Sequence, residues 1–195
     1  MTLEEFREDL INEIKDQSLI DSEYPADIFI EYCKDILIND FGVISDLYNT
    51  YIDYKTDNNQ YRNMRLDASY LELSINTVHL LISDFNEGEI QPINKEIINQ
   101  KAASMANFIH NAFRGYFNNS ADSDITTQMA REIRKNIDLV KKLHLIIIST
   151  NKKSERLKTT IALKPITIGN YEFNIDLTLL DIEGIFETKS ASFKR

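Results

Sequence analysis

The chain has 195 residues, of which 43% are hydrophobic and 27% are charged, with only 5 Gly and 3 Pro. This length and composition predict a single domain over residues 1–195 with a sizeable core, and they exclude a disordered tail or a low-complexity linker. The formal charge of −9 argues against unassisted binding of nucleic acid, because DNA binders usually carry a basic face that neutralises phosphates.

Other features of the composition bear on the compartment. The longest apolar runs, such as LHLIIIS at 143–149, are far shorter than a membrane span, so no membrane partner is expected. The N-terminal segment MTLEEFREDL is acidic and amphipathic, which is the opposite of a signal or transit peptide. Cys33 stands alone, so the sequence contains neither a disulfide framework nor a cysteine metal site. Together these features predict a cytoplasmic protein.

The first third of the chain predicts two helices and a strand. Thr2 and Glu5 have the spacing of a capping box, and an apolar stripe with helical spacing follows them. A second helix is expected from about Pro25 to Gly42. Residues 46–54 alternate in polarity and predict a strand, which the polar run KTDNNQ then ends.

The remaining elements alternate between strands and helices. We expect strands at roughly 64–73 and 77–85, joined by a tight turn at 74–76, and a strand near 171–178 followed by a short helix. Helices are predicted at 94–116 and 124–138. The continuous apolar run at 143–149 predicts a strand covered on both sheet faces, with residues 145–148 all buried.

The order of these elements predicts an α/β fold with a mixed β-sheet flanked by helices. A run of antiparallel strands comes first, and the helices that follow cross over to further buried strands. This layout suits the restriction-endonuclease-like fold, among others.

Asp67 and Asp84, one in each strand of the expected hairpin, are the candidate catalytic and metal-binding residues. A hydrolytic nuclease needs carboxylates on adjacent strands to hold divalent cations, and it usually needs a lysine near the attacking water. Alternation of side chains places Ile82 and Asp84 on one face, at the positions of the second acid and the lysine. The alternative is a purely structural role, in which Asp67 pairs with Arg65 or a neighbouring strand and Asp84 is a solvated turn residue.

Other polar residues offer weaker signals. Lys95 or Lys101 of the long helix could supply a lysine, although solvated lysines are the usual finding on helices. The three histidines, His79, His110 and His144, are isolated in the sequence and lack metal-binding spacing. Two basic clusters, REIRKNIDLVKK at 131–142 and NKKSERLK at 151–158, are either a rim for nucleic acid or a solvated face.

Four segments carry a family resemblance: TLEEFREDLINEI, MRLDASYLELSINTVHLLISDF, LHLIIIST and LLDIEGIF, in that order. Together they resemble the N-terminal region of the abortive infection phage resistance (AIPR) proteins. Members of that family resemble PD-(D/E)xK nucleases in this region and are implicated in bacterial defence against phage. The resemblance implies an Asp at the position of Asp67 and Gln-x-Lys where this chain has Ile82-Ser83-Asp84. Family members also continue beyond residue 195, so the chain is expected to be a short module or a fragment.

The sequence therefore favours the N-terminal domain of a phage-defence protein, nuclease-like but catalytically degenerate, acting through contacts with protein or nucleic acid. The alternative is an active metal-dependent nuclease that uses Asp67 and Asp84. A third hypothesis is a plain interaction domain. No cofactor is expected, except Mg²⁺ if the alternative holds. The expected partner is a protein or the remainder of a longer chain, and the charge of −9 disfavours nucleic acid.

Overall fold

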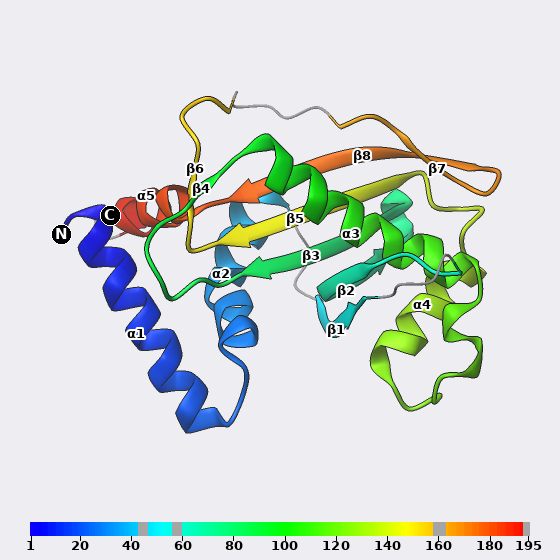
Figure 1. Ribbon diagram of the computed structural model, residues 1–195, viewed down its shortest axis with the longest axis horizontal. Coiled ribbons are helices and arrows are strands. Elements are labelled where there is room, and N and C mark those ends of the chain that lie inside the picture. The colour runs from blue at the N-terminus through cyan, green and yellow to red at the C-terminus, as the bar shows by residue number, and fades with distance from the viewer. Residues whose placement is uncertain (43–46, 56–59, 158–162, 193–195) are drawn as a thin grey trace.

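The computed structural model describes residues 1–42, 47–55, 60–157 and 163–192. Its centre is a mixed sheet with the strand order β1-β2-β3-β5-β8-β7, and a separate pair of short strands, β4 and β6, lies beside it (Figure 1). The elements are, in chain order, α1 (Leu3–Asp21), α2 (Pro25–Phe41), β1 (Tyr48–Tyr54), β2 (Met64–Glu72), η1 (Leu73–Ile75), β3 (Thr77–Asp84), β4 (Pro92–Ile93), α3 (Lys95–Phe113), η2 (Tyr116–Asn119), α4 (Ile125–Lys135), β5 (Lys142–Ser149), β6 (Lys152–Lys153), β7 (Ile166–Ile168), β8 (Tyr171–Leu180) and α5 (Ile182–Ser192).

The sheet combines antiparallel and parallel pairings. Strands β1, β2 and β3 form an antiparallel meander, with Ala68 opposite Leu81 in the β2–β3 hairpin. Helices α3 and α4 then lead to β5, which runs parallel to β3, and β8 runs parallel to β5. The edge strand β7 returns antiparallel to β8. The predicted hairpin and the mixed sheet with flanking helices are thus confirmed.

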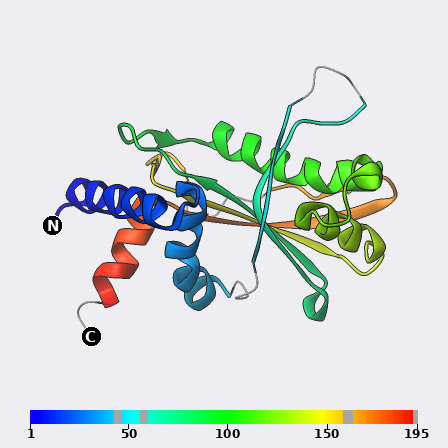
Figure 2. The same ribbon diagram turned by 90° about the horizontal axis from the view of Figure 1, so that it is seen from below.

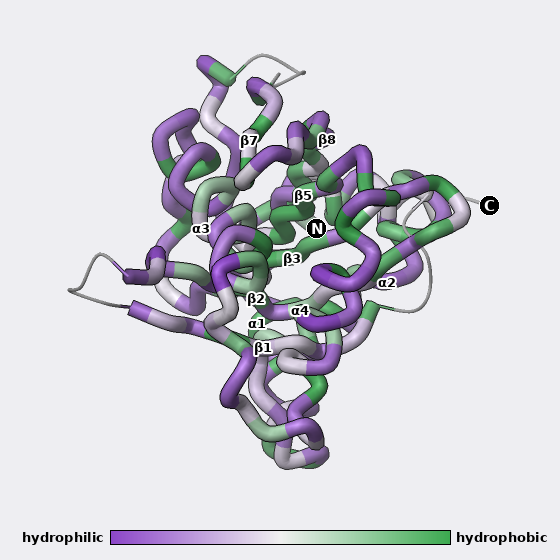
Figure 3. The backbone as a smooth tube through the Cα atoms, turned by 90° about the vertical axis from the view of Figure 1, so that its right-hand side faces the viewer, coloured by the Kyte–Doolittle hydropathy of each residue, from purple (hydrophilic) through white to green (hydrophobic). Residues whose placement is uncertain are grey.

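Helices cover both faces of this curled sheet. Figure 2 shows α3 on one face and α1, α2 and α5 on the other. Two apolar clusters correspond to these layers: Ile82 and Ile147 pack with α3 and α4 on one side, and Leu81 and Ile146 pack with α1, α2 and α5 on the other. Figure 3 shows the hydrophobic tube of β3 and β5 running through the centre of the molecule. Alternate residues of the same strands therefore build two cores.

Strand β5 is buried over its whole C-terminal half, from Leu145 to Ser149. Leu145, Ile146, Ile147 and Ile148 each have 0% exposed surface, which confirms the prediction from the continuous apolar run. A parallel strand with a neighbour on each edge and helices on both faces has no side left for water. This strand links the two apolar clusters.

Local signals fix the ends of the first helices. The Thr2 side chain accepts from the backbone N–H of Glu5, and the Glu5 carboxylate accepts from the backbone N–H of Thr2, which confirms the capping box. Helix α2 begins at Pro25 and ends at Phe41, where it is capped by Gly42, whose φ of 63° is the left-handed conformation that glycine adopts without strain.

Arg7 ties the first helix to two loops at the end of the sheet. Its side chain is buried and donates to the carbonyl oxygens of Asn86, Gly88 and Thr150, at 2.7 Å each. A guanidinium has five donors and no acceptor, so a buried arginine needs several acceptors of this kind. The loop after β3 and the end of β5 are therefore both fastened to α1.

Some predicted boundaries were wrong. The long helix was expected to continue to residue 116, but α3 ends at Phe113 because Gly115 adopts φ 87° and turns the chain into η2. The next helix was expected to reach residue 138 and ends at Lys135. The short strands β4, β6 and β7 were missed, since two or three residues carry no periodicity. Residue 46 of the strand predicted at 46–54 lies outside the described residues.

Among the described residues, no helix has the length and apolar character needed to span a membrane.

Candidate functional site

Asp67 lies on β2 and is held by its neighbours on β2 and β3. Its Oδ2 accepts from the backbone N–H of Ser83 at 2.7 Å and from the Arg65 guanidinium at 3.3 Å. Arg65 also donates to the carbonyl of Ser83, at 3.0 Å. Burial raises the pKa of Asp67, although the charge of Arg65 and the hydrogen bond from Ser83 act in the opposite direction. The expected pairing of Asp67 with Arg65 is present.

A cavity of about 510 Å³ opens beside this pair, between the start of α2 and the edge of the sheet. Its lining residues come from α2, from the three strands of the meander and from the residue after β3. They are Tyr24, Pro25, Ala26, Asp27, Asn49, Tyr51, Arg65, Asp67, Ser83 and Phe85. The register of β1 against β2 shifts between Asn49 and Ile52, so a β-bulge occurs where β1 lines the cavity. Bulges re-aim side chains and are common beside binding sites.

Two oxygen atoms beside the cavity are buried and have no hydrogen-bond partner among the described residues. They are Oδ1 of Asp67 and Oγ of Ser83. Buried polar atoms in folded proteins nearly always have partners, so each exception calls for an explanation. Asp27, at the start of α2, lines the same cavity, and burial followed by the charges of Asp67 and Glu23 raises its pKa.

Asp84, at the end of β3, has a different set of partners. Its Oδ1 accepts from Lys101 Nζ at 2.7 Å, and its Oδ2 accepts from Ser149 Oγ at 2.8 Å and from Asn151 Nδ2 at 3.3 Å. Burial alone would raise the pKa of Asp84, but the hydrogen bonds and the charge of Lys101 hold it below its ordinary value. Lys101, one of the two lysines considered from the sequence, is thus the residue that contacts the acid.

The sequence analysis placed the second acid position of a nuclease at Ile82, and the structure shows that the neighbouring residue, Ser83, lies beside Asp67 instead. Ile82 was expected to lie on the face of Asp67, yet it is buried against α3. Ser83 is the β3 residue that lines the cavity with Asp67, while Asp84 contacts Lys101 of α3. Strict alternation was assumed along each strand, but Leu66 and Ala68 of β2 belong to opposite apolar clusters, and the regular β2–β3 pairing ends at Ala68 and Leu81.

The donors around the two acids suit a divalent cation poorly. Each carboxylate already has a side-chain cation at hydrogen-bonding distance, Arg65 for Asp67 and Lys101 for Asp84. A metal ion beside either would meet that positive charge, and Ile82 supplies no oxygen. Among the described residues, no group of three or more His, Cys, Asp or Glu side chains is placed to hold a metal ion.

His79 and His144 are isolated in the sequence, but the fold brings their side chains into contact. Their Nδ1 atoms lie 3.0 Å apart across β3 and β5, although the residues are 65 positions apart in the chain. His79 Nε2 is also 3.0 Å from the Glu72 carboxylate, and His144 Nε2 is 2.8 Å from Thr178 Oγ1. Four side chains on neighbouring strands therefore form one hydrogen-bonded row.

The basic clusters are largely engaged within the chain. Arg131 pairs with Asp122, and Arg134 donates to Asn118 at 2.8 Å. Lys142 pairs with Asp176, and Lys152 pairs with Glu183, at 3.0 Å each. Residue 158, at the end of the second cluster, lies outside the described residues.

The sequence analysis did not identify Ser149 and Asn151, two of the residues that donate hydrogen bonds to Asp84. A signal for them was present, because Ser149-Thr150-Asn151 follows the buried apolar run directly. In a parallel pair, residues that end neighbouring strands meet at one edge of the sheet. No comparable signal marks Tyr24, Asn49 and Tyr51, which reach the cavity from separate elements.

The fold and these residues define a mixed α/β domain with two ion-paired carboxylates at one end of its sheet. The model of the abortive infection phage resistance protein N-terminal domain matches residues 29–187, and the chain belongs to this family. The match begins within α2, so it does not include the opening helix that contributed to the resemblance. Searches of curated proteins and of solved structures found no match.

Proposed function

We propose that this chain is a nuclease-like but catalytically degenerate domain of a phage-defence protein, which acts by binding protein or nucleic acid. Membership of the abortive infection family supports the role in defence. The order of α2, the β1–β2–β3 meander, α3 with α4 and the parallel β5 supports the nuclease-like core, since it is the layout expected of the restriction-endonuclease-like fold.

The observation that carries the proposal is the pairing of each acid with a side-chain cation. Arg65 pairs with Asp67 and Lys101 pairs with Asp84, so a metal ion shared by the two carboxylates would compete with a side-chain cation at each of them. Metal-assisted hydrolysis needs an ion that activates water and stabilises the charge developing on the phosphate. An isoleucine at position 82 contributes to neither task.

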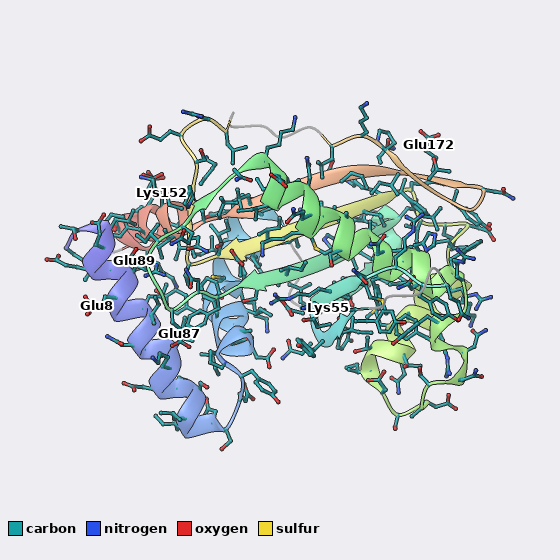
Figure 4. All side chains as sticks on the ribbon, in the orientation of Figure 1. Glu8, Lys55, Glu87, Glu89, Lys152 and Glu172 are labelled. Carbon is teal, nitrogen blue, oxygen red and sulfur yellow. The ribbon has the colours of Figure 1, made fainter. Side chains whose placement is uncertain are left out.

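The charge around this end of the sheet also opposes a polyanionic substrate. Glu8 of α1 and Glu87 and Glu89 of the loop after β3 are labelled there in Figure 4. They line a shallow cleft together with Lys15, which pairs with Glu87 at 2.9 Å. With a net charge of −9, the chain repels a phosphate backbone at long range.

A cleavage assay on the purified chain tests the proposal. DNA and RNA, single- and double-stranded, are incubated with the chain and either Mg²⁺ or Mn²⁺. We expect no cleavage above the rate of identically purified Asp67→Ala and Asp84→Ala variants, which control for contaminating nucleases. Metal-dependent cleavage that disappears in both variants would overturn the proposal.

One observation favours the alternative, an active metal-dependent nuclease using Asp67 and Asp84. A nuclease usually needs a lysine near its acids, and Lys101 contacts Asp84 at 2.7 Å. The same assay decides the matter when a Lys101→Met variant is added. Under the alternative, cleavage by the parent chain is abolished by this change, whereas under the degenerate-domain proposal there is no cleavage to lose.

A further inference from the structure

We propose that the cavity between α2 and the β1–β2–β3 meander binds a single nucleobase, held against exposed tyrosine rings and read at its polar edge by Arg65 and Asn49. The cavity volume of about 510 Å³ falls within the range of small-molecule sites, about 300–1,000 Å³. The ligand site is separate from the Asp84–Lys101 pair, none of whose residues lines it.

The mouth of the cavity carries two large aromatic side chains that the fold does not bury. Tyr24 is 79% exposed and Tyr51 is 65% exposed, and they come from the residue before α2 and from β1. Phe85, after β3, adds a third ring. Aromatic faces that remain open to solvent are the surfaces on which nucleic-acid-binding proteins stack bases.

The polar lining offers donors and acceptors together, as the edge of a base requires. Arg65 presents only donors, Asn49 presents both kinds, and Asp27 presents acceptors. Ser83 and Asp67, whose Oγ and Oδ1 atoms are buried and partnerless, also line the cavity. A purely apolar ligand would use none of the donors and acceptors that Arg65, Asn49 and Asp27 present, whereas a nucleobase carries donors and acceptors along one planar edge.

The negative charge around the cavity indicates whether the base belongs to a nucleoside or to a nucleic-acid strand. Asp27 and Asp67 line the cavity, and Glu13, Glu23 and Glu31 line the adjoining cleft. These carboxylates disfavour a phosphate more than a neutral sugar. We therefore assign the site to a nucleoside rather than to the end of a nucleic-acid strand. This assignment rests on the proposed function, in which the domain binds its ligand and does not cleave it.

Fluorescence titration with the riboside of 2-aminopurine tests the inference, since its emission falls on stacking and the chain has no tryptophan to interfere. We expect saturable quenching. Tyr51→Ala should weaken binding by about tenfold or more, because base stacking on an aromatic ring is lost. Tyr51→Phe retains the ring and should bind within about twofold of the parent chain.

The matched control is Tyr48→Ala, which also removes an exposed tyrosine of β1 but one that does not line the cavity. Circular dichroism verifies that each variant is folded. Absence of quenching, or an equal loss in the Tyr48→Ala and Tyr51→Ala variants, overturns the inference. A second arm uses a short single strand with 2-aminopurine at its end, and tighter binding of the strand than of the nucleoside overturns the nucleoside assignment.

The two proposals fail separately. A nucleoside contains no phosphodiester bond, so its binding is measured whether or not the chain cleaves nucleic acid. Cleavage products in the strand arm would overturn the degenerate-domain proposal and leave the nucleoside titration to be judged by itself.

Discussion

The row of side chains from Glu72 to Thr178 can be fully hydrogen-bonded with both imidazoles neutral. A carboxylate only accepts, so His79 Nε2 carries a proton and donates to Glu72. His79 Nδ1 then accepts from His144 Nδ1, and His144 Nε2 accepts from the Thr178 hydroxyl. Both imidazoles are neutral in this arrangement, in keeping with burial, which lowers the pKa of each ring.

This arrangement makes the stability of the fold depend on pH. Burial, and then repulsion from the neighbouring His79 ring when that ring is protonated, lowers the pKa of His144 from 6.5 to about 4. The unfolded chain therefore takes up a proton at higher pH than the folded chain does. The free energy of unfolding should fall as the pH drops from about 6.5 towards 4, and this contribution is fully present above that window.

Urea titrations at several pH values check this prediction. His144→Asn cannot bind a proton, so the variant should show a shallower loss of stability between pH 6.5 and 4 than the parent chain. The charged groups nearby are Glu72, Lys142 and Asp176, and they are the same in both proteins. Parallel pH profiles for the two chains would show that His144 does not titrate differently on folding.

At the level of elements, β5 contributes buried side chains to both cores. Ile147→Ala removes buried methyl groups on the α3 face and should cost about 2–5 kcal/mol of unfolding free energy. The exposed Leu139 provides the control, since Leu139→Ala should change stability by no more than about 0.5 kcal/mol. Chemical denaturation measures both, and similar values for the two variants would contradict the burial of β5.

The strands and helices that the sequence predicted well are those with a local pattern. The β2–β3 hairpin and β5 follow from alternation and from a continuous apolar run over seven or more residues. The end of α3 was missed because Gly115 acts through backbone conformation, which apolar spacing does not report. The contacts of Arg7, of Asp84 with Ser149, and of His79 with His144 join residues at least 65 positions apart. No local pattern encodes such pairs.

For the whole molecule, the central question is whether the two faces of the sheet unfold together. Ile147 belongs to the cluster beneath α3 and α4, and Cys33 belongs to the cluster beneath α1, α2 and α5. The strands that supply both clusters are the same, so loosening one face should loosen the other.

Cys33 is the only cysteine of the chain, and burial raises the pKa of its thiol, so it reports this coupling. In the native chain a thiol reagent should react with Cys33 only through opening of the fold. Ile147→Ala lies on the opposite face, yet it should raise the reaction rate by about tenfold for each 1.4 kcal/mol of lost stability. A rate that stays unchanged while the unfolding free energy falls would indicate that the two faces open independently.

The anchoring of Arg7 has a consequence for how the protein is made. The arginine is translated before the residues whose carbonyl groups bind it, which are residues 86, 88 and 150. Helix α1 cannot reach its final position until β5 has been translated and paired. During that interval the apolar residues Leu10 and Ile14 of the helix have no core to pack against, so the growing chain exposes them to solvent.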